Sequence, residues 1–118
     1  MLAACSQPSR EEQAAQAALV YYQLLLSGSA DDFLAGKAGV DSLPADYRRQ
    51  LAKSVEQYVA DMKRRHEGLC GVAVSPNIGQ TDTALHLTHA FLLLSYGDST
   101  EEEITVPMVE EGGAWKMR

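Results

Sequence analysis

The sequence predicts a small α+β domain in which helices from the first half of the chain pack on an antiparallel sheet from the second half. Apolar residues recur at helical spacing up to about residue 66, and from residue 69 they recur at every second position. Three helices followed by about four strands are typical of a fold with its helices on one side of a curved sheet. A chain of 118 residues is long enough to bury one core, so we expect a single domain over residues 9–118.

The first helix has clear start and stop signals. Ser9 and Glu12 have the spacing of a capping box, and Gly28 supplies the left-handed conformation that often follows a helix. Between them, apolar residues form one stripe at Ala14, Ala18, Tyr21 and Leu25. A second cap at Ser29, followed by two aspartates, predicts a short helix that Gly36 and Gly39 stop.

The third helix is predicted to be the longest. Pro44 suits its first turn, cations crowd its last turn, and Gly68 closes it. Its apolar stripe consists of Tyr47, Leu51, Val55, Tyr58 and Met62. Burial of such a side chain contributes about 1.5–3 kcal/mol, so we expect this face to form the floor of the core.

Four strands are predicted after residue 69. The first runs from Leu69 to a break at residues 76–79, and the second spans residues 83–96, long enough to bend across a curved sheet. The third carries alternate apolar residues on one face (Ile104, Val106 and Met108), and Pro107 indicates that it lies at an edge or a bulge. The fourth covers residues 114–118 and contains Trp115.

Composition excludes several classes of partner. The net charge of −6 argues against nucleic acid, and no run of 18 apolar residues is present to span a membrane. Cys70 lies in an apolar run, where we expect a small buried side chain rather than a disulfide with Cys5. No metal-ligand spacing is present, and we expect neither a metal nor another cofactor.

Residues 2–6 (Leu-Ala-Ala-Cys-Ser) match the cleavage box of a bacterial lipoprotein, with Cys5 as the lipidated residue. Residues 1–8 then form the box and a polar spacer of about 10–14 Å when extended. We therefore expect a domain in the cell envelope that meets the membrane through its lipid anchor only. If Met1 is instead the true start, the alternative is a cytoplasmic accessory subunit or homodimer.

Three segments carry a resemblance to a known fold. They are Leu25 to Phe33 with its break at Gly28, Tyr96-Gly97-Asp98 before an acidic run, and Val106-Pro107-Met108-Val109 followed by Gly113-Ala114-Trp115-Lys116. In these segments and in its order of elements the chain resembles the nuclear transport factor 2-like fold. It is similar to small bacterial lipoprotein domains of unknown function, related to lumazine-binding-like domains. The resemblance implies a cone with a pocket between sheet and helices.

Candidate pocket residues are Tyr21, Tyr47, Tyr58 and His89. We interpret the tyrosines first as core aromatics with hydroxyls at the rim. His86 and His89 lie three apart in a predicted strand and therefore point to opposite faces. The favoured hypothesis is a domain that binds a small ligand or an envelope protein without chemistry. The alternative is a small isomerase- or dehydratase-like enzyme that uses a pocket tyrosine and a strand histidine.

Overall fold

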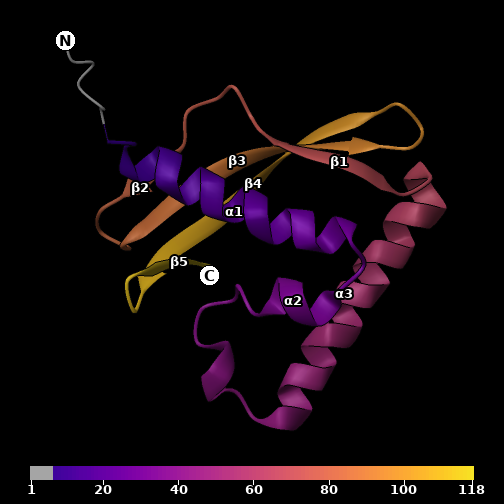
Figure 1. The fold of residues 1–118 in the computed structure, drawn as a ribbon, viewed down its shortest axis with the longest axis horizontal. Coiled ribbons are helices and arrows are strands. Elements are labelled where there is room, and N and C mark those ends of the chain that lie inside the picture. Colours follow the sequence, from indigo (N-terminus) through magenta and orange to yellow (C-terminus); the bar gives the residue numbers. More distant parts are fainter. Residues whose placement is uncertain (1–6) are drawn as a thin grey trace.

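The computed structural model describes residues 7–118, and Figure 1 shows its helices on one side of a twisted sheet. The predicted lipoprotein box, including Cys5, lies outside the described residues. The helices are α1 (Arg10–Leu26), α2 (Ala30–Leu34), the short 3-10 helix η1 (Val40–Ser42) and α3 (Ala45–His66). The strands are β1 (Leu69–Val74), β2 (Gln80–Asp82), β3 (Leu87–Tyr96), β4 (Glu101–Glu111) and β5 (Ala114–Met117). The predicted α+β class, with helices on a curved antiparallel sheet, is confirmed.

The sheet is antiparallel, with β3 at its centre. Its main order is β1-β3-β4-β5, and β2 pairs with the first residues of β3 on the side where β1 pairs with the last ones. The loop between β1 and β2 therefore leaves the sheet and returns to the same edge. Helix α1 lies across one face (Figure 1).

The core is the interface between α1 and the middle of the sheet. Ala14 and Ala18 on α1 are completely buried, as are Ala90 and Leu92 on β3. Because alanine carries only a methyl group, the α1 backbone approaches the sheet closely. The predicted face of β4 completes this core through Ile104, Val106 and Met108. The caps at Ser9 and Ser29 also form as predicted, each accepting a hydrogen bond from the amide three residues later.

The prediction that α3 forms the floor of the core is wrong, because α1 occupies that position. Met62 is the only buried residue of α3, whereas Tyr47 and Tyr58 are 48% and 40% exposed. The last turns of α3 reach Leu94 and Tyr96 before the chain enters β1. A helix of 22 residues is about 33 Å long, so its first half extends beyond the sheet, as Figure 1 shows.

The predicted second strand is also shorter than expected. Strand β3 begins at Leu87, and residues 83–86 form a turn that joins it to β2. The carboxylate of Asp82 accepts a hydrogen bond from the Leu85 amide, and His86 has a positive φ of 54°. An aspartate that caps its own turn in this way explains the break. His86 therefore lies in the turn and not in a strand.

Cys70 is exposed, contrary to the prediction that it is buried. It lies in β1, where the pairing with β3 is irregular between Leu69 and Gly71. Strand β1 is an outer strand, so an apolar run there does not require burial on both faces. Among residues 7–118, no helix combines the length and apolar character needed to cross a membrane.

Pro107 lies in β4 at the end of the pairing with β5, in agreement with the prediction that a proline in this strand marks an edge or a bulge. The ladder between β4 and β5 ends at Met108 and Met117, and one further bond runs from the Arg118 amide to the Pro107 carbonyl. Residues 101–106 of β4 continue beside β3 without β5 on their other side. Proline suits this position because it has no amide to donate.

Candidate binding site

The four predicted pocket residues do not converge on one point. Tyr21 donates its hydroxyl to the Trp115 carbonyl at 2.7 Å, which ties α1 to β5. Tyr47 lies near the exposed start of α3, and Tyr58 lies three turns further along the same helix. His89 lies on β3, and the alternating burial of that strand places it on the face opposite α1.

His89 is held between two neighbouring strands. Its register partners are Gln80 on β2 and Pro107 on β4. Its Nδ1 atom is buried without a hydrogen-bond partner among the described residues. None of the predicted pocket tyrosines shares its face of the sheet, because Tyr21 belongs to α1 on the other side.

Aromatic side chains do gather where α1, α2 and α3 meet. The Tyr22 and Phe33 rings pack edge to face, with centroids 5.1 Å apart. Burial raises the pKa of Tyr22 to about 12, with a further contribution from Tyr58. Burial also raises the pKa of Tyr58, and the nearby charge of Glu102 adds to this effect.

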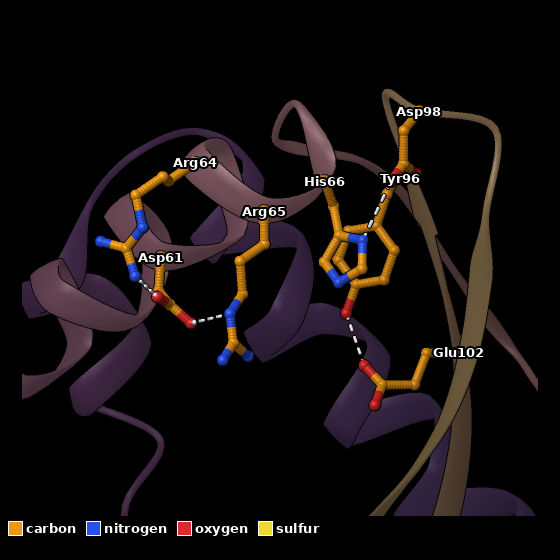
Figure 2. A network of polar contacts seen from close by, with 7 residues as sticks. All are labelled: Asp61, Arg64, Arg65, His66, Tyr96, Asp98 and Glu102. Carbon is orange, nitrogen blue, oxygen red and sulfur yellow. Dashed lines mark hydrogen bonds and ion pairs between the residues drawn. The ribbon is translucent and has the colours of Figure 1, made fainter.

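Beside this aromatic group lies a polar network that joins the end of α3 to the hairpin between β3 and β4 (Figure 2). The Tyr96 hydroxyl donates to Glu102 at 2.6 Å, and His66 Nδ1 lies 3.0 Å from the Asp98 carboxylate. Burial raises the pKa of Tyr96, and the hydrogen bond to Glu102 raises it further. The hydrogen bond from the Thr100 hydroxyl lowers the pKa of Asp98 most, and the hydrogen bond with His66 lowers it further. One turn back, Asp61 pairs with Arg64 and Arg65.

A groove of about 410 Å³ lies between α2, η1 and the first half of α3. Its apolar lining comes from Leu34, Ala35, Val40, Ala45 and Ala52. Asp31 and Asp41 stand on the side of α2 and η1, and Arg48 and Arg49 stand on the side of α3. Arg49 also pairs with Asp46, whereas Arg48 forms no ion pair with any residue in the described part of the chain.

A smaller pocket of about 190 Å³ lies at the junction of sheet and helices. Tyr22, Phe33 and Lys37 line it from the helical side, and Thr105 and Arg118 line it from the sheet. Drug-sized ligands occupy pockets of about 300–1,000 Å³, so this pocket has room for a single side chain or a similar group.

The two hollows and the polar network have different chemical capabilities. Over residues 7–118, no group of three or more histidine, cysteine, aspartate or glutamate side chains is placed to hold a metal ion. The Tyr96 hydroxyl is committed to Glu102 and lines neither hollow. The groove, in contrast, carries acidic side chains on one side and basic side chains on the other side of an apolar lining.

Sequence reasoning did not find the residues of this network or the cations of the groove. The sequence indicated only that cations crowd the last turn of α3 and that an acidic run follows Tyr96-Gly97-Asp98. The available signal was Tyr96-Gly97-Asp98, which places an aromatic residue and a carboxylate on either side of a turn. The register that brings Glu102 beside Tyr96 exists only in the folded hairpin.

Comparison with known proteins supports the class of fold. The chain has an NTF2-like α+β fold, in agreement with the resemblance stated from its sequence. Among solved structures, it is similar to a crystal structure from Campylobacter jejuni described as an NTF2-like transpeptidase, with a TM-score of 0.65. The match covers 86% of this chain and 94% of that one at 11% sequence identity, so the similarity concerns the fold. No family model and no curated protein matches this sequence.

Proposed function

We propose that this protein is a non-enzymatic binding domain of the cell envelope that holds a small dipolar ligand in the groove between α2, η1 and α3. The observation that carries the proposal is the placement of Asp31 and Asp41 on one wall of the groove and of Arg48 and Arg49 on the other. An NTF2-like fold is compatible with binding, but a fold alone does not identify an activity.

The groove indicates the chemistry of the ligand. Its volume of about 410 Å³ lies within the range of small-molecule sites. The guanidinium groups suit a carboxylate or a phosphate, and the aspartates suit an ammonium group. An apolar portion between these groups fits over Leu34, Val40 and Ala52. The ligand class is therefore a small amphiphile that carries both charges.

The envelope location rests on the box at Leu2 to Ser6. Lipidation of Cys5, followed by a short spacer, places the domain close to a membrane surface. An amphiphilic ligand with both charges fits a protein in that position, because such molecules occur at membrane surfaces.

An enzymatic function remains the second candidate because a tyrosine hydroxyl does meet a carboxylate, at Tyr96 and Glu102. The raised pKa of Tyr96 makes its hydroxyl a weaker acid than an ordinary phenol. That change opposes proton donation at neutral pH, so the pair is better suited to holding the hairpin against α3.

The ligand hypothesis is tested with protein purified from its own host and measured by native mass spectrometry. We expect a retained small molecule in the wild-type protein and a loss of most of its occupancy in Arg48→Gln. Arg64→Gln is the matched control, because it removes the same charge from the same helix outside the groove. Wild-type protein without a bound molecule, or equal occupancy in both variants, would contradict the proposal.

The anchoring hypothesis needs a separate experiment. Cells expressing the full-length gene are fed an azido fatty acid, and the labelled protein is detected after coupling to a dye. We expect label on the wild-type protein and none on Cys5→Ala, with Cys70→Ala as the control that keeps its label. Label that persists in Cys5→Ala would show that Cys5 is not the anchor.

A further inference from the structure

Two large apolar side chains project into solvent from the two connections that flank β2. Ile78, in the loop between β1 and β2, is 82% exposed, and Leu85, in the turn between β2 and β3, is 59% exposed. They are the two most exposed large apolar side chains among residues 7–118. Strand β2 has three residues, so it separates the two connections by about 10 Å. Both side chains therefore belong to one end of the molecule, at the edge of the sheet opposite β5.

Hydrogen bonds hold both connections in place. In the turn, the Asp82 carboxylate accepts from the Leu85 amide at 3.1 Å. In the loop, the Ser75 hydroxyl accepts from the Asn77 amide at 3.1 Å, and the Asn77 side chain donates to Glu103 of β4 at 2.6 Å. Because these bonds already fix the backbone, a surface that buries the two apolar side chains has little further chain to order.

The first turn of α1 lies at this same end. The Thr81 hydroxyl donates to the Glu11 carboxylate, and Glu11 and Ile78 line one pocket between α1 and the loop. Figure 1 shows the start of α1 beside β2 and the first half of α3 far from both. The helix begins at Arg10, five residues after Cys5, and the spacer between them is about 10–14 Å long when extended. Acyl chains on Cys5 therefore bring this end of the domain close to the membrane.

The charges at this end favour one kind of membrane surface. Glu11, Glu12 and Asp82 lie here, and the guanidinium of Arg10 is paired with Glu110 at 2.5 Å. Anionic headgroups attract basic segments, so an acidic end such as this one disfavours them. Zwitterionic headgroups impose no such repulsion, and the apolar region beneath them lets an isoleucine and a leucine side chain leave water.

We propose that Ile78 and Leu85 dock the domain on a zwitterionic lipid surface, so that β2 and the start of α1 face the membrane. The proposal rests on the anchoring at Cys5 that forms part of the proposed function. Two side chains alone bind a bilayer weakly, but an acyl anchor keeps them at the surface, where a weak contact is sufficient. The groove between α2, η1 and α3 then lies on the side away from the bilayer, open to the aqueous phase (Figure 1).

An acyl chain attached by chemistry tests the docking. In the full chain carrying Cys70→Ala, Cys5 is coupled to a maleimide that bears a single myristoyl chain. Partition into vesicles of phosphatidylcholine and phosphatidylethanolamine is measured by sedimentation, and it responds to further contacts because one such chain binds only marginally. We expect Ile78→Ser combined with Leu85→Ser to lower the partition coefficient about fivefold. Val20→Ser is the matched control, since Val20 is 53% exposed on α1, and it should leave the coefficient unchanged.

Fluorescence quenching tests the orientation of the domain on the same vesicles. Leu85→Trp should shift its emission to shorter wavelength and be quenched by phosphatidylcholine with brominated acyl chains. Tyr47→Trp, at the exposed start of α3, should show neither effect. Trp115 is present in both variants, and its signal is subtracted with that of the parent protein.

The possible outcomes separate docking from its alternatives, with circular dichroism verifying that each variant is folded. Equal partition of the double variant and Val20→Ser, or equal quenching of Leu85→Trp and Tyr47→Trp, would overturn the proposal. It would also be overturned if the protein without an acyl chain formed dimers that the double variant abolishes, because the two side chains would then join copies of the chain. Since the acyl chain is supplied chemically, these results do not depend on lipidation in cells, so docking and anchoring can fail separately.

Discussion

The imidazole ring of His66 stacks on the phenol ring of Tyr96, with centroids 4.4 Å apart and an angle of 20° between the rings. His66 is the last residue of α3, and Tyr96 is the last residue of β3. The same imidazole also contacts Asp98 in the following turn. The stack therefore joins the end of α3 to the sheet, beside the cluster that the buried Met62 forms with Leu94 and Tyr96.

We expect His66→Ala to reduce the free energy of unfolding by about 2 kcal/mol, because it removes the ring stack and the contact with Asp98. His66→Phe retains a ring and should lose about half as much. Urea denaturation followed by circular dichroism measures both values. If the two variants are equally destabilised, the stack contributes nothing and the polar contact accounts for the whole effect.

The small residues of α1 lead to a second prediction. Ala18 is completely buried against the sheet, so Ala18→Leu forces the helix and sheet apart and should cost about 1–3 kcal/mol. Ala60→Leu is the matched control, since Ala60 is exposed on α3 and both residues favour helices. Thermal unfolding should separate the two variants clearly. Similar stability of both would mean that α1 does not pack closely on the sheet.

The sequence predicted those features that local pattern determines. Ser9 and Ser29 cap helices as their types and spacing indicated, and the alternation at Ile104, Val106 and Met108 identified the buried face of β4. A capping hydrogen bond and the two-residue period of a strand both depend on neighbours along the chain, so they are visible in one segment.

The position of α3 and the polar network depend on contacts between distant segments. The stripe from Tyr47 to Met62 has the same spacing whether a sheet covers it or solvent does, so it did not indicate that α1 would take the central place. The contact between Tyr96 and Glu102 requires the register that pairs Leu94 with Glu102. The sequence marks a turn at Gly97 but not which residues close it, and the length of the turn sets the register.

A third prediction concerns the close approach of Gly36 to the ring of Tyr21. A methyl group on Gly36 would overlap this ring, which the hydrogen bond to the Trp115 carbonyl holds in place. We expect Gly36→Ala to lower the free energy of unfolding by about 1–3 kcal/mol. In a Tyr21→Ala background the same change should cost much less, and a double-mutant cycle measures the difference. Additive costs would show that the two residues do not compete for space.

The last prediction follows from the burial of Tyr22, which raises its pKa to about 12. The folded state therefore favours the neutral phenol, and this contribution to stability is complete below the unfolded pKa of about 10. This contribution to stability is lost as the pH rises through the folded-state pKa of about 12. In an alkaline titration followed by phenolate absorbance, Tyr22→Phe should remove one of the late ionisation steps. Between about pH 10 and 12 the stability of wild type should fall more steeply than that of Tyr22→Phe, and parallel curves would mean that Tyr22 is not shielded from solvent.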